Sequence, residues 1–452
     1  MLRSARIRAI PRTMKLTSRL TALSLTSISH PLSNRVFNEH FMNSVSFSKR
    51  LALLVCVGLS ALPTLLMAQA GSLDPTFGTN GIVTTANTGA NAAALQSDSK
   101  IVVAGSIPAS QNFQQPGLLR YNTNGTLDPN FGAGGEVMIA GNNAGPAFAV
   151  AVQTDGKILA AAPANFRLTV FRFNTNGSPD STFGNNGAVA IEAAGLFFSA
   201  SGGIALQPDA KILVVSGRFA ARLLPNGQLD STFGSNGAAA TVGGDSVALL
   251  PNGEILIGDG SVMSLYKTNG SLDTKFGVHG QSAGFAFNGA GGFVISTDTI
   301  TNVTKVITAG GLITSPSLTF AQSISGFLLV RYSSDGTVDN SFGSRGGVAT
   351  PFPGNIFSQA FSVALQTNGQ IVVAGQTALT DVSAVPGPSD FGLARYNANG
   401  RIDPTFGNGG FVSTPFGSSE AFANTVLIQT DGKIVAVGNS NNGTTIARYL
   451  AN

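Results

Sequence analysis

The sequence predicts an all-β fold, a seven-bladed β-propeller with four strands in each blade. An eight-residue motif, D-x-x-F-G-x-x-G, occurs seven times at intervals of 43 to 66 residues, and a repeat of this size suits one propeller blade. Between the motifs, short apolar runs flank Asn-Gly or Asp-Gly, a pattern typical of a β-hairpin. No sustained helical period competes with this pattern after residue 70.

The motif itself predicts a structural joint. Asp is a favoured helix N-cap, Pro suits the first helical position, and Gly tolerates the left-handed conformation that ends a helix. We therefore expect one capped helical or 3₁₀ turn, with its Phe buried between blades. The Asp and Phe pairs are Asp74 and Phe77, Asp128 and Phe131, Asp180 and Phe183, Asp230 and Phe233, Asp273 and Phe276, Asp339 and Phe342, and Asp403 and Phe406.

The segments between motifs supply the strands. A short apolar piece follows each motif, then a hairpin such as SVALQTNGQIVVAG (Ser362 to Gly375), then a third run such as LLRYNTNG (Leu118 to Gly125). Four short strands per unit favour a propeller. A β-helix would need shorter rungs, and separate β-sandwiches would need units of about 100 residues.

An arginine stands eight residues before most motif Asp residues, and we expect an Arg–carboxylate bridge there. The arginines are Arg120, Arg172, Arg222, Arg331 and Arg395, whereas the fourth unit has Leu265. Arg448 holds the same place, but the chain ends before another Asp. We therefore predict that Ile82 to Thr85 forms the outermost strand of the last blade, with Asp74 near Arg448, which would close the ring and remove two sheet edges.

These repeats resemble the bacterial delta-60 repeat proteins, over about residues 71 to 452. The resemblance rests on the seven motifs and implies a β-propeller domain of unknown function and an exported protein. It implies no activity. The fifth unit departs most from the pattern, because GFVISTDTITNVTKVITAGG lacks the Asp-Gly turn.

Residues 1 to 70 read as an N-terminal extension plus a signal peptide. Ser48-Lys49-Arg50 precedes the apolar run Leu51 to Leu66, and a small-x-small site predicts cleavage after Ala70. The run is short for a membrane span, although an uncleaved anchor is the alternative. Because Met42 would begin a leader of ordinary length, it is the predicted true start. The mature chain would be periplasmic or extracellular, without a membrane span.

The charge of the leader hides that of the mature chain. Residues 1 to 70 hold nine of the 26 Lys and Arg residues and one of the 22 acidic residues, so the remainder has a formal net charge of −4. The overall basic balance therefore predicts no nucleic-acid partner. Cys56, the single cysteine, lies inside the apolar run, so packing and sheet hydrogen bonds must hold the exported domain together.

Few side chains after residue 70 suit catalysis or metal binding. The motif Asp residues invite a calcium interpretation, but the loops lack the carboxylate density of a calcium site, and no cofactor is expected. His279 is the one histidine after the leader, so a zinc site or a Ser-His-Asp triad is disfavoured and a surface histidine is expected. The recurrent Lys100, Lys157, Lys211 and Lys433 are interpreted as solvated turn residues.

Function is expected on loops that differ between units. The connections Ser106 to Gly117, Gly310 to Gly326 and Gln376 to Asp390 are long and emerge on one face. They predict a patch that binds a protein or a glycan of the cell envelope or surroundings, unless they are unselected insertions. Its candidate residues are Phe113, Gln114, Gln115, Phe320, Asp381 and Asp390.

The preferred function is therefore a noncatalytic exported scaffold, acting as a monomer. The alternative is a propeller hydrolase or lactonase that uses channel carboxylates and a divalent ion. Its candidate acids lie in the fourth unit, at Asp245, Glu254 and Asp259.

Overall fold

A computed structural model describes residues 69–108, 114–139, 145–192, 199, 201–258, 262–282, 292–297, 304–314, 324–379, 387–417, 420–441 and 443–451. Contacts within the chain divide it into two units, Met1–Leu66 and Met67–Asn452. All the described residues belong to the second unit. In this part of the chain, no helix is long and apolar enough to cross a membrane.

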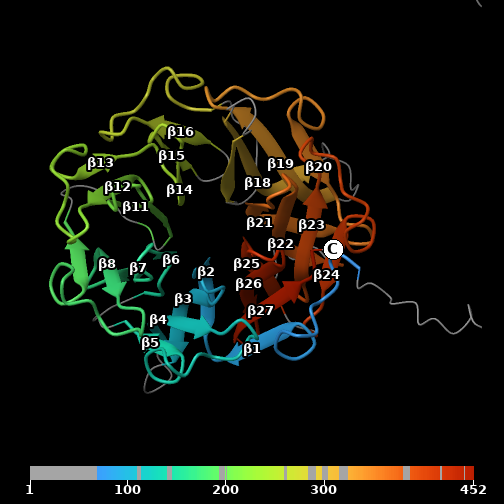
Figure 1. Ribbon diagram of the computed structural model, residues 1–452. Helices are drawn as coiled ribbons and strands as arrows, with labels where there is room; N and C mark the ends of the chain where they lie inside the picture. Colours follow the sequence, from blue (N-terminus) through green and yellow to red (C-terminus); the bar gives the residue numbers. More distant parts are fainter. Residues whose placement is uncertain are drawn as a thin grey trace, which may run out of the picture. The chain divides into compact units, whose positions relative to one another are not determined.

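The second unit is a ring of seven antiparallel sheets, which confirms the predicted seven-bladed β-propeller (Figure 1). Blade 1 contains β2 (Gly89–Leu95), β3 (Ile101–Pro108), β4 (Gln114–Tyr121) and β5 (Glu136–Met138); blade 2 contains β6 (Ala149–Val152), β7 (Ile158–Ala164), β8 (Arg167–Phe173) and β9 (Ala188–Ile191). Blade 3 contains β10 (Gly203–Leu206), β11 (Ile212–Ser216), β12 (Phe219–Leu223) and β13 (Ala238–Ala240); blade 4 contains β14 (Ser246–Leu249), β15 (Ile255–Gly258) and β16 (Met263–Tyr266).

The remaining blades complete the ring. Blade 5 contains β17 (Phe293–Thr297), β18 (Thr304–Thr314), β19 (Ile324–Ser333) and β20 (Gly347–Thr350); blade 6 contains β21 (Phe357–Leu365), β22 (Ile371–Ala378), β23 (Asp390–Tyr396) and β24 (Phe411–Thr414). Blade 7 contains β25 (Ala421–Ile428), β26 (Ile434–Ser440), β27 (Gly443–Tyr449) and, from the start of the domain, β1 (Ile82–Ala86). In blade 4, a single bridge between Ser264 and Gln281 stands where the other blades have an outer strand.

The ring closes as the sequence predicts. Strand β1 pairs with β27 from Ile82 opposite Ala447 to Ala86 opposite Gly443. The outermost strand of blade 7 therefore comes from the beginning of the domain, and in Figure 1 the blue β1 lies against the red β27. This pairing removes two unpaired edges and ties the two ends of the propeller together.

The second and third strands of each blade form the apolar layers of the core. Strands β11, β12, β15, β16 and β22 are buried along their whole length. Both faces of a blade pack on neighbouring blades, so these strands read as continuous apolar runs rather than as an alternating pattern. The core consequently lies at the interfaces between neighbouring blades, which we call seams. Among the described residues, each seam contains one apolar cluster.

Candidate functional site

The motif turn begins with its Asp. In the first copy, Asp74 Oδ1 accepts hydrogen bonds from the backbone N–H of Thr76 at 3.0 Å and from its hydroxyl at 2.7 Å. The N–H of Phe77 donates to the backbone oxygen of Asp74 at 3.1 Å. These bonds make one capped turn, as the sequence predicts, without a helix following it.

The glycine after Phe is required by a close approach. Gly78 has a φ of 54°, and a Cβ at this position would lie 2.3 Å from the backbone oxygen of Ile82. A side chain would collide with the following strand in addition to its backbone strain.

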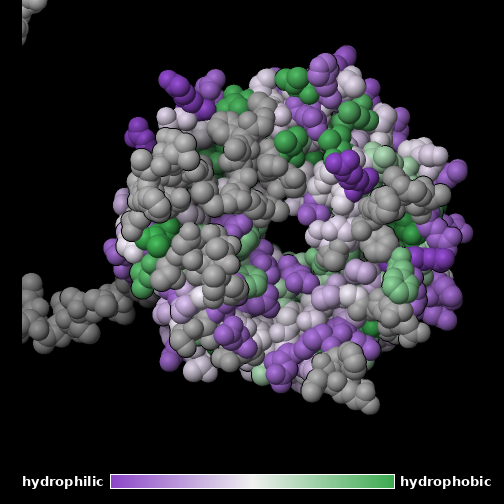
Figure 2. All heavy atoms as spheres, turned by 180° about the vertical axis from the view of Figure 1, so that it is seen from behind, coloured by the Kyte–Doolittle hydropathy of each residue, from purple (hydrophilic) through white to green (hydrophobic). Residues whose placement is uncertain are grey.

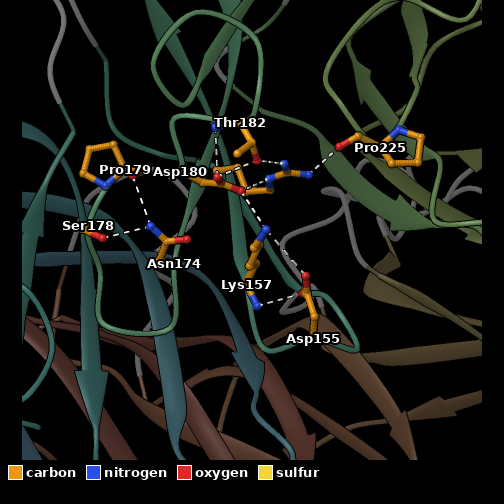
Figure 3. Close-up of polar contacts among 9 residues, drawn as sticks. Asp155, Lys157, Asn174, Ser178, Pro179, Asp180, Thr182 and Pro225 are labelled. Carbon is orange, nitrogen blue, oxygen red and sulfur yellow. Dashed lines mark hydrogen bonds and ion pairs between the residues drawn. The ribbon is translucent and has the colours of Figure 1, made fainter.

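An arginine pairs with six of the seven motif Asp residues, as expected, and reaches the next blade. In blade 2, Arg172 Nε donates to Asp180 Oδ2 at 2.7 Å, its Nη2 donates to the Thr182 hydroxyl at 3.2 Å, and its Nη1 donates to the Pro225 backbone oxygen of blade 3 at 2.5 Å (Figure 3). The other Arg–Asp pairs lie at 2.8 to 2.9 Å: Arg120–Asp128, Arg222–Asp230, Arg331–Asp339, Arg395–Asp403 and the ring-closing Arg448–Asp74.

Each guanidinium also covers the motif Phe. The Arg172 Cζ atom lies 4.4 Å from the centre of the Phe183 ring, and Arg448 Cζ lies 4.6 Å from that of Phe77. This geometry adds a cation–π attraction to the ion pair. Phe77 is fully buried among side chains of blades 7 and 1. The arginine, the Asp and the Phe therefore form an inter-blade latch, and the repeated motif is a structural joint.

The interpretation of the recurrent lysines is wrong. Lys157 Nζ lies 3.0 Å from Asp180 Oδ2 and 3.8 Å from Asp155 Oδ2, so it bridges the latch and the hairpin turn (Figure 3). Lys100, Lys211 and Lys433 approach Asp128, Asp230 and Asp74 in the same way, at 3.0 to 3.5 Å. The hairpin of the same blade brings the lysine back to the motif Asp, a tertiary contact that local turn chemistry does not reveal.

The latch favours the ionised carboxylate. Burial raises the pKa of Asp230, but hydrogen bonds from Thr232 and the charge of Arg222 more than offset it and lower that pKa to about 2. The pKa of Asp339 likewise falls to about 2, because Ser341 and Arg331 outweigh its burial. Both oxygens of Asp230 already accept hydrogen bonds from side chains or backbone. In the copies that have the arginine, the motif Asp is thus engaged by the latch.

Blade 4 shows what the seam looks like without the arginine. Leu265 occupies the position, and Asp273 is half-buried, with its Oδ1 accepting from the backbone N–H of Lys275 at 3.2 Å. Phe276 is still buried. The motif Phe is therefore buried in this seam even without the ion pair.

Two faces of the ring differ in the turns that they carry. The motif face carries the motif turns and the turns between the first and second strands. The connection face carries the passages from the second to the third strand and from one blade to the next, because alternate connections in an antiparallel sheet leave on the same side. Figure 2 shows one face of the ring with a central opening, and the apolar residues on it form separate patches among hydrophilic ones.

Strand pairing extends into the described ends of the three long connections on the connection face. Strands β3 and β4 remain paired as far as Pro108 opposite Gln114, and β18 and β19 as far as Thr314 opposite Ile324. Strands β22 and β23 pair as far as Thr377 opposite Asp390. Backbone pairing continues into these segments, so the strands extend beyond the repeat consensus.

The structure places part of the predicted patch. Gln114 and Gln115 begin β4, and the exposed Gln114 donates from Nε2 to the Asn87 backbone oxygen at 3.1 Å. Asp390 begins β23 and accepts from the Ser413 hydroxyl at 2.6 Å. These residues belong to blades 1 and 6 and have local partners. Phe113, Phe320 and Asp381 lie outside the described residues.

Sequence reasoning missed the apolar residues of the connection face. Among the described residues, six large apolar side chains are exposed, and five lie at this face: Met138 at the end of β5, and Phe166, Val242, Ile356 and Leu379 on its connections. The sixth, Val278, lies in a motif turn. The sequence does reveal a turn at Asn165-Phe166, which interrupts an otherwise regular hairpin. It does not reveal that the Phe166 side chain is exposed, because a lone Phe between two strands can equally be buried.

Phe166 is the most unusual of these residues. It is 76% exposed at the tip of the β7–β8 hairpin, with a φ of 60°. Asn165, with a φ of 52°, precedes it in the same two-residue turn. Gly, Asn or Asp is preferred at both positions of such a turn, and a bulky residue there is strained. Arg167, next to it, forms an exposed ion pair with Glu192.

Blades 5, 6, 7 and 1 are joined by hydrogen bonds between neighbouring blades. The inner strands β2, β21 and β25 each contain a register shift, whereas the inner strands of blades 2 to 5 pair regularly. The Ser325 hydroxyl donates to the Ser358 backbone oxygen at 2.7 Å, which joins blades 5 and 6. The Ser389 hydroxyl joins blades 6 and 7 through Ala421 at 2.9 Å. Asn439 joins blades 7 and 1 through Ala90 at 2.7 Å.

The carboxylates proposed for the hydrolase alternative are not together. Asp245 precedes β14 and Glu254 precedes β15, so they lie at opposite ends of β14 and on opposite faces of the ring. Five residues of extended strand separate them by roughly 16 Å. Glu254 accepts from Asn252 Nδ2 at 2.7 Å, and Asp259 lies outside the described residues. His279, in the turn after Phe276, is exposed as expected.

Six segments of the chain match the family described as a domain of unknown function (DUF5122) beta-propeller. They are residues 96–131, 153–183, 207–233, 318–342, 366–406 and 429–452. The chain therefore contains a β-propeller domain of unknown function. Four of the segments run from the first hairpin of a blade into its motif, whereas 318–342 begins after the second strand of blade 5 and 429–452 contains no motif. The segments leave out residues 234–317, where Leu265 replaces the latch arginine. The delta-60 name stays a prediction.

One solved structure supports the fold, and two others show a weaker likeness. Virginiamycin B lyase from Staphylococcus aureus is 11% identical, with a TM-score of 0.51 over 82% of this chain and 98% of that one. The extracellular domain of a one component system from B. thetaiotaomicron is 14% identical, with a TM-score of 0.42 over 82% of this chain and 40% of that one. A protein from Lactobacillus plantarum is 13% identical, with a TM-score of 0.44 over 72% and 85%. A comparison with curated proteins gives no match.

Proposed function

We propose that this chain is an exported, noncatalytic β-propeller that binds a protein or a glycan through its connection face. The proposal is carried by the location of the exposed large apolar side chains, since five of the six among the described residues lie at that face. An excess of exposed apolar and aromatic side chains on one face favours recognition of a partner there. The latch holds the motif Asp and Phe residues in structural contacts, so these residues do not form the proposed protein-binding surface.

Of the two ligand classes, the exposed side chains suit a protein best. Phe, Met and Arg are enriched in the centres of protein interfaces, and Phe166, Met138 and Arg167 are all exposed on blades 1 and 2. The strained turn places an aromatic ring where Asn or Gly would be more stable. Strain of this kind clusters at functional sites.

The test compares capture of envelope components by matched variants. The bait is the purified chain, as wild type and with Phe166→Asn and Leu379→Asn together. Both side chains are more than 70% exposed, so their loss leaves the core intact. Val278→Asn, on the motif face, is the control.

We expect the double variant to lose the proteins or glycans that the wild type retains, and Val278→Asn to retain them. Equal capture by all three baits would reject the connection face as the binding surface. Export is tested separately, because processing after Ala70 predicts a mature protein that begins at Gly71. An N-terminal peptide from before Met42 would contradict the proposed start, and an intact leader in the envelope would contradict cleavage.

A further inference from the structure

The motif face contains three equivalent clefts at the seams between blades. Their volumes are about 430 Å³ between blades 7 and 1, 450 Å³ between blades 3 and 4, and 530 Å³ between blades 1 and 2. Each is lined by a glutamine and a lysine from the first hairpin, the latch arginine and an Asn from the neighbouring blade. The Asn residues are Asn124, Asn269 and Asn176, respectively.

The clefts are polar but close to neutral. The charges lining the first are those of Asp98, Asp431, Lys433 and Arg448, which sum to zero. The cleft between blades 1 and 2 is neutral in the same way, and the one between blades 3 and 4 carries one excess positive charge. Balanced charges disfavour a strongly ionic ligand and favour one that offers neutral donors and acceptors.

Each cleft presents an oriented amide donor. Asn124 Oδ1 accepts from the N–H of Thr126 at 3.1 Å and from its hydroxyl at 2.8 Å, which fixes the amide plane. Asn176 Oδ1 and Asn269 Oδ1 are held by Ser178 and Ser271 in the same way. Within the part of the chain that the structure describes, Nδ2 of these three residues has no hydrogen-bond partner. A fixed amide with a free N–H₂ group matches a hydroxyl acceptor.

A buried carbonyl beneath each cleft also lacks a partner. Gln429, which lines the cleft between blades 7 and 1, is 5% exposed, and its Oε1 has no hydrogen-bond donor among the described residues. Its Nε2 donates to the Ser99 backbone oxygen at 3.3 Å, which holds the side chain across the seam. Gln207 and Gln96 line the other two clefts, and their Oε1 atoms are also unpaired. An unpaired buried carbonyl is costly and calls for a donor such as a hydroxyl.

We propose that the seam clefts of the motif face bind hydroxyl groups of a neutral polysaccharide. A hydroxyl both donates and accepts, so it matches the orphaned Gln carbonyl and the free Asn amide of the same cleft. The clefts offer no exposed aromatic ring for stacking, so each contact is weak. Because equivalent clefts recur around the ring, a polymer with repeating sugars can occupy several of them and gain avidity. This site is distinct from the connection face.

The chain provides a conservative variant for the test. Asp335 occupies the Asn124 position in another blade, and its Oδ1 accepts from Thr337 N–H at 3.0 Å and from its hydroxyl at 2.6 Å. Asn→Asp therefore keeps the turn, removes the amide donor and adds one negative charge. The test variant combines Asn124→Asp, Asn176→Asp and Asn269→Asp. The probes are dextran, mannan, xylan and arabinogalactan, each dissolved in a native gel, and the measure is the slowing of each protein relative to its own polymer-free gel.

At least one polymer should slow the wild type, and the triple variant should bind that polymer about tenfold more weakly with an unchanged Tm, because multivalent contacts are lost together. Phe166→Asn, on the connection face, should bind it like the wild type. The proposal is overturned if no polymer slows the wild type, or if the triple variant is slowed equally. It is also overturned if Phe166→Asn alone abolishes binding, since the polysaccharide would then be a ligand of the connection face.

Discussion

Removal of the ring-closing arginine should destabilise the whole domain. Arg448 Nε lies 2.8 Å from Asp74 Oδ2, its Nη2 lies 3.0 Å from the Thr76 hydroxyl, and both charged side chains are at most 6% exposed. Arg448→Met keeps an apolar stem but leaves Asp74 with Lys433 at 3.5 Å as its remaining ion-pair partner. Breaking a buried pair in this way costs about 3 to 5 kcal/mol.

The corresponding change in melting temperature follows from the size of the domain. Unfolding entropy of about 2.1 cal/mol/K per residue over residues 71 to 452 gives roughly 0.8 kcal/mol/K, so Tm should fall by about 4 to 6 °C. Differential scanning calorimetry measures this change. Hydrogen exchange should show that the amides of β1 (Ile82–Ala86) lose protection first.

A second variant separates the ion pair from general disruption. In Arg448→Met with Asp74→Asn, no unpaired charge remains in the seam, so the double variant should be more stable than Arg448→Met alone. The matched control is Arg331→Met, because Arg331 and Asp339 are more exposed, at 16% and 10%, and should lose less. A loss below about 1 kcal/mol for Arg448→Met, or additive losses in the double variant, would refute the role of the latch in closure.

Three further predictions concern the latch and the connection face. In the folded protein the pKa of Asp230 and of Asp339 is lowered to about 2, from an unfolded value of about 3.9. The stability that these two carboxylates contribute is therefore complete above pH 4 and is lost as the pH falls toward 2. A Tm that stays flat from pH 5 to pH 2 would contradict this. Leu265→Arg should supply the missing partner of Asp273 and raise the free energy of unfolding by about 1 kcal/mol in urea, and a loss of stability would show that the fourth seam cannot accept a latch. Phe166→Asn should stabilise the fold by about 1 kcal/mol, because Asn tolerates the left-handed turn; destabilisation would show that the Phe has a packing role.

The repeated parts of this protein could be predicted from the sequence because each repeat restates the same local rule. Asp at the turn, Phe in the seam and Gly after it are determined by neighbours within a few residues. The Arg448–Asp74 contact spans 374 residues, yet it was predictable, since five other copies of the pair lie eight residues apart. The repeat thus allows a contact between residues far apart in the sequence to be predicted from copies in which the two residues are close.

What does not repeat was harder to predict. The lysines were assigned to solvent because their pairing with the motif Asp depends on how the hairpin folds back. The sequence predicts loops for the long connections of blades 1, 5 and 6, but the strands remain paired into the ends of these connections. Phe166 escaped notice, because exposure and a positive φ are properties of the folded hairpin rather than of its composition.

Photo-cross-linking in cells tests most directly whether function lies on the connection face. A photoreactive amino acid in place of Phe166 lies on that face, and one in place of Val278 lies on the motif face, with exposures of 76% and 66%. We predict protein adducts from the first position and none from the second. Adducts from Val278 alone, or from both positions equally, would contradict the assignment of the binding surface.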